Sequence, residues 1–227
     1  MKITYIHHSS FIVELKNHIL LFDYFQGNLP QFNKNKKLYV FSSHSHHDHF
    51  NKSIFKLNKI HPDVTYLLSK DINSPKSENI KLLDANKKLV IDNLEIETLQ
   101  SSDLGVAFIV KVENKTIYHG GDLNWWHWEG ENSPEENAYA EKLFKDSVDK
   151  IKGKIIDLAF LPLDSRQGNE YYLGFDYFMR STNTKIAFPM HFWRTYSLVK
   201  IFKASNYALN YKDKIIEINH ENEEFQL

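Results

Sequence analysis

The stretch Ser43-His44-Ser45-His46-His47-Asp48-His49 decides how the chain is interpreted. It follows the apolar run 38–42, whose β-branched and aromatic residues predict a buried strand. If His44 and His46 continue the strand, their side chains fall on one face and can converge on one cation. Asp48 and His49 would then lie in the turn and face a second cation about 3.5–4 Å away. A solvated histidine-rich loop is the alternative, but the run is internal, contains Asp and adjoins a core strand, so we expect a metal site.

Composition narrows the chemistry of that site. The chain has 227 residues, of which 42% are hydrophobic and 25% charged, and this is ordinary globular composition. A formal net charge of −1 argues against a general nucleic-acid-binding surface, so we expect a small-molecule substrate and no nucleic acid. The chain has no cysteine, and imidazole, carboxylate and water are therefore the available metal ligands. Zn, Mn and Fe suit this set.

Location and domain organisation follow from what the chain lacks. The N-terminal residues 1–7 show no apolar core or cleavage site of a signal peptide, and no run approaches the roughly 20 apolar residues of a membrane span. We therefore expect a cytoplasmic protein without membrane insertion. No linker or low-complexity segment appears, which predicts one domain over residues 1–227. The oligomeric state is not predicted.

Alternating β and α patterns predict the order of elements. An antiparallel meander is expected from three short β-like runs at 2–7, 10–15 and 19–24. A strand, helix, strand crossover is expected from the strand 38–42, a short helix capped by Asn51 that ends before Pro62, and the strand 64–68. Five further strands are expected at 80–83, 88–91, 94–99, 106–112 and 115–119. The rest predicts helices at 134–152, 175–181 and 197–205 and strands at 155–161, 185–190 and 214–219.

Further candidate ligands stand at the ends of these strands. Two glycines before Asp122 let the backbone turn sharply, which makes this carboxylate a candidate bridging ligand, with an ordinary Gly-Gly-Asp turn as the alternative. His191 follows the strand 185–190 at once, and sites in open α/β sheets form beyond the carboxyl ends of strands. His8 and Asp23 also end strands. We expect them to support the ligands, with Asp23 accepting a hydrogen bond from a ligand imidazole.

Aromatic residues follow Asp122 in the sequence. Trp125, Trp126, His127 and Trp128 could form a wall that binds an apolar or ring-containing substrate, or simply a packed loop. Arg166 could bind an anionic substrate group, or be a salt-bridged loop residue. We count all five as candidate substrate contacts.

These motifs resemble a known family. His44-Ser45-His46-His47-Asp48-His49 matches the His-x-His-x-Asp-His signature of the metallo-β-lactamase fold superfamily, and Gly121-Asp122 and Pro189-Met190-His191 stand at its later motif positions. The resemblance covers essentially the whole chain. Within this superfamily, the chain is most similar to the short single-domain branch that includes ascorbate-phosphate lactonase-like and phospholipase D-like members. The implied fold is an α/β, four-layer αββα sandwich, with two mixed β-sheets flanked by helices and the metals at one edge.

The resemblance also implies a ligand set and a mechanism. His44 and His46 would bind a first divalent metal ion, Asp48, His49 and His191 a second, and Asp122 would bridge both. Zn is favoured, with Mn or Fe as alternatives. A metal-activated water would attack a carbonyl or a phosphorus, and Asp48 would also act catalytically by accepting or donating a proton.

One motif position departs from the family pattern. Relatives carry a further first-metal histidine where this chain has Ser101-Ser102-Asp103-Leu104. Three replacements stay open: Asp103 is the ligand, His7 or His8 reaches across, or the first metal is weakly held. We therefore expect one or two bound metals, with the second position the tighter.

The implied function is a metal-dependent hydrolase acting on a small ester, lactone or phosphodiester. One alternative is a non-catalytic or weakly active metal-binding module with a degenerate first site. The other is a redox di-iron enzyme on the same fold, which is disfavoured because that chemistry usually carries Glu in place of His46.

Overall fold

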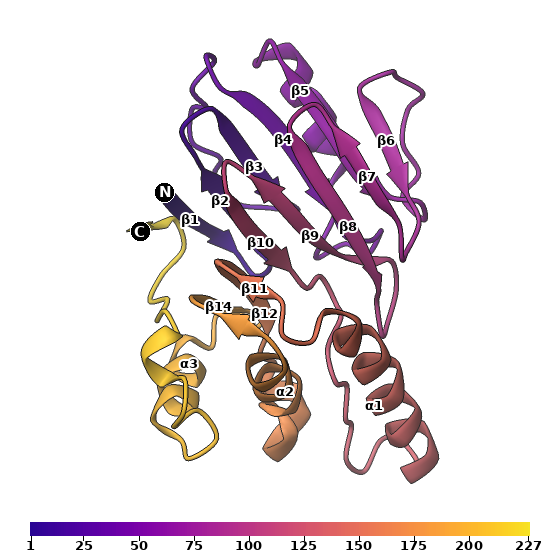
Figure 1. The fold of residues 1–227 in the computed structure, drawn as a ribbon, viewed down its shortest axis with the longest axis vertical. Coiled ribbons are helices and arrows are strands. Elements are labelled where there is room, and N and C mark those ends of the chain that lie inside the picture. Colours follow the sequence, from indigo (N-terminus) through magenta and orange to yellow (C-terminus); the bar gives the residue numbers. More distant parts are fainter.

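In the computed structural model, which describes residues 1–227, six strands from the N-terminal part of the chain and one C-terminal strand form a seven-stranded mixed sheet (Figure 1). Its order is β15-β1-β2-β3-β4-β5-β6, antiparallel from β15 to β3 and parallel from β3 to β6. The strands are β1 (Lys2–His7), β2 (Ser10–Glu14), β3 (His18–Phe22), β4 (Lys37–Ser42), β5 (Val64–Ser69), β6 (Ile80–Leu83) and β15 (Glu223–Gln226). The predicted meander and crossover are confirmed, because β1 to β3 pair antiparallel and β4 pairs parallel with β5.

A second mixed sheet of six strands packs against the first. Its order is β14-β12-β10-β9-β8-β7, parallel among β14, β12 and β10 and antiparallel from β10 to β7. The strands are β7 (Lys88–Ile91), β8 (Leu94–Gln100), β9 (Val106–Val112), β10 (Lys115–His119), β12 (Leu158–Pro162) and β14 (Ala187–Met190). A short parallel pair, β11 (Ile155–Ile156) and β13 (Asn183–Thr184), forms a separate two-stranded sheet.

Helices complete the sandwich on both sides, which confirms the predicted α/β fold class. On the second sheet lie α1 (Pro134–Val148), α2 (Leu173–Ser181) and α3 (Tyr196–Ala204), below the strands in Figure 1. Ser133 begins α1 with a capping box that it forms with Glu136, as the sequence of that turn favours. On the first sheet the layer is thin, because it consists of η1 (Lys52–Lys59), a 3-10 helix that buries Ile54 and Leu57.

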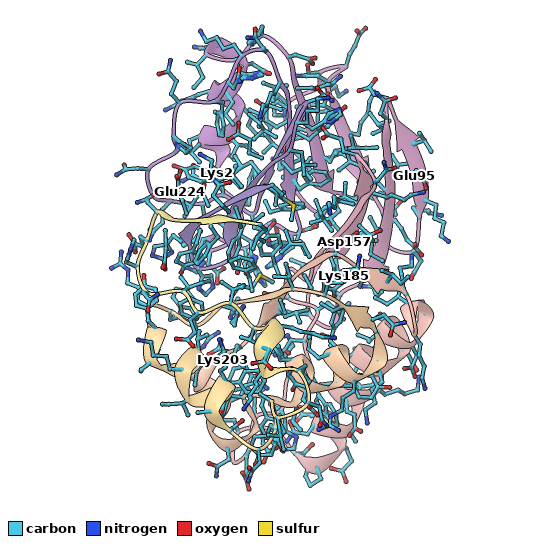
Figure 2. All side chains as sticks on the ribbon, turned by 60° about the vertical axis from the view of Figure 1, so that its left-hand side comes forward. Lys2, Glu95, Asp157, Lys185, Lys203 and Glu224 are labelled. Carbon is cyan, nitrogen blue, oxygen red and sulfur yellow. The ribbon has the colours of Figure 1, made fainter.

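Two clusters of buried side chains hold these layers together. The larger one has 46 buried residues, fills the space between the sheets and continues under the three α-helices. The smaller one has 13 and lies between the first sheet and η1. Ion pairs such as Lys2 with Glu224 and Lys185 with Asp157 lie outside both clusters, and Figure 2 labels these four residues. Exposed pairs of this kind contribute about 0–1 kcal/mol each, so burial of apolar surface carries the fold.

Several predicted elements differ in the structure. The segment 51–60 is a 3-10 helix rather than an α-helix, although Asn51 caps it as expected. The helix predicted at 134–152 is α at Pro134–Val148 and then 3-10 (η2, Asp149–Ile151), and the strand predicted at 155–161 divides into β11 and β12. Likewise, the strand predicted at 185–190 divides into β13 and β14.

The predicted closing strand at 214–219 is wrong. Its segment follows a 3-10 turn, η4 (Lys212–Lys214), and makes one isolated bridge, from Ile215 to Ala187. The closing strand is β15, which pairs with β1 and brings the two ends of the chain together. Met1 N donates to Leu227 O at 2.9 Å across this pair.

Candidate metal centre

Six strand ends meet at one place between the two sheets. In the first sheet β1, β3 and β4 run parallel to one another, and in the second sheet β10, β12 and β14 do the same. The carboxyl ends of these strands carry the polar residues of the centre: His8, Asp23, the stretch 43–49, Asp122, Asp164 and His191. In Figure 1 the arrowheads of β1 and β10 point toward this region, above the helices.

Backbone strain at these strand ends aims the side chains inward. His8, Asp23 and His191 have φ of 53°, 44° and 67°, in the left-handed region that L-residues rarely adopt. Gly121 has φ of 52°, and a Cβ there would lie 2.6 Å from Ser43 Cβ, so the turn before Asp122 requires glycine. The stretch after β4 is not strand, because β4 ends at Ser42 and bends and turns follow. His44 and His46 therefore approach each other through a turn, with ring centroids 4.6 Å apart, and not through strand alternation.

The carboxylate of Asp122 lies between two groups of imidazoles. Its Oδ1 is 3.0 Å from His49 Nε2 and 3.3 Å from His191 Nε2, and its Oδ2 is 3.4 Å from His44 Nε2. One oxygen therefore faces each group, which is the arrangement expected of a bridging ligand. The donor atoms of His8, Asp48, His49 and His191 lie within 4.8 Å of one another, and so do those of His44, His46 and Asp122.

Many of the side-chain atoms that could bind a metal here lack hydrogen-bond partners. Nε2 of His44, His49 and His191, both ring nitrogens of His8, and Oδ1 of Asp122 are buried and make no hydrogen bond of acceptable geometry, although the three Nε2 atoms lie 3.0–3.4 Å from oxygens of Asp122. Leaving one such group unsatisfied costs about 1–3 kcal/mol, so a convergent set of them requires a ligand. Imidazole nitrogens and carboxylate oxygens are the donors that Zn, Mn and Fe accept, and the residues present therefore fit divalent metal ions.

Buried carboxylates orient two of the imidazoles through hydrogen bonds to Nδ1, the ring nitrogen that does not face Asp122. His49 Nδ1 donates to Asp23 Oδ2 at 2.7 Å, and His191 Nδ1 donates to Asp164 Oδ2 at 2.9 Å. Such bonds place the proton on Nδ1 and leave the Nε2 lone pair free to bind a metal. For His44 the same role falls to a neighbouring hydroxyl: Ser43 Oγ donates to Asp23 Oδ2 at 2.6 Å and can accept from His44 Nδ1 at 3.0 Å.

Charges in the centre favour a bound cation. Burial lowers the pKa of His49, but the carboxylates of Asp122 and Asp23 outweigh burial and hold it well above its ordinary value. The pKa of Asp122 is held well below its ordinary value, because His49 and His191 outweigh its burial. Without metal, protons on these imidazoles balance the carboxylates, so metal binding should release protons. His8 differs, since burial lowers its pKa to about 3 and keeps its imidazole neutral.

The group of His44, His46 and Asp122 is more open than the group of His8, Asp48, His49 and His191. The ring of His46 is 47% exposed, and its Nδ1 lies 3.9 Å from Asp103 Oδ2. Gly105 explains why Asp103 comes close: the loop passes so near His44 that a Cβ on Gly105 would lie 2.6 Å from His44 Cβ. The structure therefore places Asp103, and neither His7 nor His8, beside the first group. His7 instead contacts Gln26 at 2.9 Å.

A pocket of about 570 Å³ opens onto the centre. Its lining combines metal-centre residues with aromatic, acidic and cationic ones: His46, His47, Asp48, Ser102, Asp103, Asp122, Trp126, Trp128, Asn132, Ala140, Arg166 and His191. The rings of Trp126 and Trp128 stack with centroids 5.6 Å apart, and the Arg166 guanidinium lies 5.7 Å from the Trp128 ring centroid. Three of the five predicted substrate contacts therefore line the pocket.

Trp125 and His127 do not line it. Trp125 packs near Tyr177, with ring centroids 6.3 Å apart, and His127 borders a separate surface hollow. The loop 123–128 has no regular secondary structure, so neighbours in sequence point in different directions.

Three residues of the centre were missed by the sequence analysis. Ser43 links Asp23 to His44, and the indole of Trp193 covers His8 with ring centroids 4.0 Å apart. Asp164 binds His191 and also accepts from Arg166 Nε at 3.0 Å. Asp164 had a usable signal, because it follows a buried strand at the same sheet edge as Asp122 and His191.

This combination defines the class of protein: an α/β sandwich whose two sheets share a histidine- and aspartate-rich metal centre at one edge. Residues 2–129 match the beta-lactamase superfamily domain, and the chain belongs to that family.

Similar proteins agree with this assignment. The chain is 28% identical over 231 residues to the UPF0173 metal-dependent hydrolase NEQ378 of Nanoarchaeum equitans, covering 93% of this chain and 91% of that one. It is 29% identical over 197 residues to the UPF0173 metal-dependent hydrolase YtkL of Bacillus subtilis, covering 77% and 76%. Igni18, a metallo hydrolase of Ignicoccus hospitalis, shares the fold with a TM-score of 0.67 at 17% identity, over 100% of this chain and 98% of that one. No helix in the structure combines the length and apolar character needed to cross a bilayer.

Proposed function

We infer that the chain works as a metal-dependent hydrolase, and we propose that its substrate is a small ester, lactone or phosphodiester. The observation that carries this proposal is the set of unpartnered imidazole nitrogens around Asp122. A pocket of about 570 Å³ opens onto these residues. A pocket of that volume suits a small molecule rather than a polymer, and this is why we also propose a small-molecule substrate without nucleic acid.

Two metal positions would share the work. His44, His46 and Asp122 would hold the first ion, with Asp103 in reach of His46, and Asp48, His49, His191 and Asp122 would hold the second. When bound, such ions lower the pKa of water and polarise a substrate oxygen. We propose Zn²⁺ as the native ion, because imidazoles dominate the donor set, with Mn²⁺ or Fe²⁺ as alternatives.

The protein residues would position the reactants and move the proton. Asp48 lines the pocket floor beside His8 and His191, so its carboxylate can accept the proton of the attacking water or return one to the leaving group. Arg166 is half exposed in the same pocket and held by Asp164, so its guanidinium can bind an anionic substrate group. Trp126 and Trp128 offer a flat apolar wall to the remaining part of the substrate.

The test is a hydrolysis panel on metal-loaded protein. Protein loaded with Zn²⁺, Mn²⁺ or Fe²⁺ is assayed against an aryl ester, a lactone and an aryl phosphodiester, before and after chelation. We expect hydrolysis of at least one class, lost on chelation and restored by metal. Asp122→Asn should lower kcat/KM by about 100-fold or more, because a bridging ligand is lost. Asp213→Asn, at an exposed site, is the matched control. Activity that survives chelation, or no hydrolysis with any ion, contradicts the proposal, and the second outcome favours the non-catalytic module.

A further inference from the structure

His8 occupies a strained and tightly held position beside the centre. It begins the turn after β1 with φ of 53°, and its side chain is fully buried. Its backbone N donates to Tyr5 Oη at 2.8 Å, and its carbonyl accepts from His191 N at 3.3 Å. Because His191 also has a positive φ, two strained residues from different sheets hold each other in place.

The imidazole of His8 faces the second metal position. Its Nε2 lies 3.6 Å from Asp48 Oδ2, and its ring centroid lies 4.2 Å from that of His191 and 5.8 Å from that of His49. Trp193 covers the ring on another side, at 4.0 Å between centroids. The side chain is therefore enclosed by aromatic rings and by residues of the centre.

Neither ring nitrogen of His8 has a hydrogen-bond partner. Two neighbouring histidines each have a partner for at least one ring nitrogen, although Nδ1 of His7 also lacks one. His7 Nε2 contacts Gln26 at 2.9 Å, and the buried His119 donates through Nε2 to Ser9 O at 2.9 Å. A buried imidazole without any partner, held in a strained conformation and aimed at other unpartnered donor atoms, requires a ligand of its own.

We propose that His8 is a metal ligand at the second position, alongside Asp48, His49, His191 and the bridging Asp122. Two ligands on opposite sides of one ion lie at most about 4.2 Å apart when each bond is about 2.1 Å. The separations in the structure, 3.6 Å from His8 to Asp48, 3.9 Å from His191 to Asp48 and 3.3 Å from His191 to Asp122, fall within this limit.

The added ligand would make the two positions unequal. The second position gains a third imidazole, whereas the first has two imidazoles, of which the ring of His46 is 47% exposed. With His8, the side chains available to an ion at the second position would be three imidazoles and two carboxylates. The chain thus lacks the family's histidine in the segment 101–104, and no other imidazole takes its place at the first position. His8 instead adds an imidazole at the second position.

The test compares two phenylalanine substitutions in neighbouring histidines. His8→Phe keeps an aromatic ring but removes both nitrogens, and His7→Phe is the matched control, since His7 contacts Gln26 and belongs to neither group of donor atoms. Metal affinity is measured by competition with a chelator, and coordination by the visible spectrum of the Co²⁺ form. Both readouts rest on metal binding alone, so they stay informative for a protein that hydrolyses none of the substrates above.

His8→Phe should lower the affinity for the more tightly bound metal ion by about 10–100-fold or more. A loss of 10–100-fold is usual even when the residue removed is only hydrogen-bonded to a metal ligand. The substitution should also alter the Co²⁺ spectrum. Without metal it should be no less stable than the unsubstituted protein, because an unpartnered buried imidazole gives way to an apolar ring. Unchanged affinity and spectrum in His8→Phe, or equal loss in His7→Phe, overturn the proposal.

A measurement on the unsubstituted protein covers the case in which His8→Phe does not fold. NMR of the isotope-labelled cadmium form should show scalar coupling between the bound cadmium and one ring nitrogen of His8, as for His49 and His191. Coupling to His49 and His191 without coupling to His8 refutes the assignment.

Discussion

Asp164→Asn should weaken metal binding at the second position without disturbing the fold around it. Asp164 is fully buried, and its Oδ2 accepts from His191 Nδ1 at 2.9 Å and from Arg166 Nη2 at 2.5 Å. Its Oδ1 accepts from Arg166 N at 2.9 Å and so begins the 3-10 helix η3 (Ser165–Glu170). Asparagine keeps that oxygen but replaces Oδ2 with an NH₂ group, which donates and cannot accept a hydrogen bond from His191 Nδ1.

The loss acts through the tautomer of His191. Without an acceptor at Nδ1, the ring can place its proton on Nε2, the nitrogen that faces Asp122 at 3.3 Å. The lone pair needed by the metal is then occupied. Carboxylates behind a ligand histidine are typically worth about 10–100-fold in metal affinity, or about 1.4–2.7 kcal/mol. We expect a loss in that range for the tight equivalent.

The assay is a chelator competition on both Asp164→Asn and a matched control. Asp176→Asn is that control, because Asp176 also holds an arginine, Arg180, at 2.7 Å, but contacts no histidine. Equal affinity in Asp164→Asn and the unsubstituted protein would refute the tautomer argument. An equal loss of metal affinity in both variants would show that the loss follows from breaking any aspartate–arginine ion pair and not from the tautomer of His191.

Three further changes test other parts of the molecule. Arg166→Gln should raise KM about 10-fold for an anionic substrate and leave KM for a neutral ester unchanged, because one charge-assisted contact is lost; equal effects on both would contradict its role. Gly121→Ala should lower the free energy of unfolding in urea by about 1–3 kcal/mol more than Gly130→Ala, since both have positive φ but only the first crowds Ser43. Burial raises the pKa of Tyr66 from 10.0 to about 12, so its contribution to stability is complete below pH 10 and is lost as pH rises toward 12. Tyr66→Phe should therefore lose less stability over that interval in alkaline melts, and an unchanged alkaline loss would refute this.

Strand-end positions made much of the centre predictable from the sequence. Asp23, Asp122 and His191 each follow a buried run, and parallel strands bring their carboxyl ends to one edge. The same rule could have identified Asp164, which follows the buried strand β12 but was not named in the sequence analysis. His8 could be placed near the centre but not at the second position, because that depends on the contact between the ends of β1 and β14 from two different sheets.

Local pattern failed where long-range pairing decides the structure. Ile215 and Ile218 are buried and gave the segment 214–219 a strand-like pattern, yet it makes one bridge only. The mostly polar segment Glu223–Gln226 forms the real closing strand because β1 offers it a free edge. The periodicity of 52–59 likewise suits either kind of helix, so it could not distinguish 3-10 from α.

The most direct test of the account is a zinc titration of the metal-free protein with the affinity of each equivalent resolved. The central claim is a two-metal centre whose second position, lined by His8, His49, His191 and Asp48, binds more tightly than the first. We predict one tight equivalent and a second at least about 10-fold weaker, because the first position has fewer and more exposed imidazoles. Two equally tight equivalents, or no binding at all, would contradict the claim.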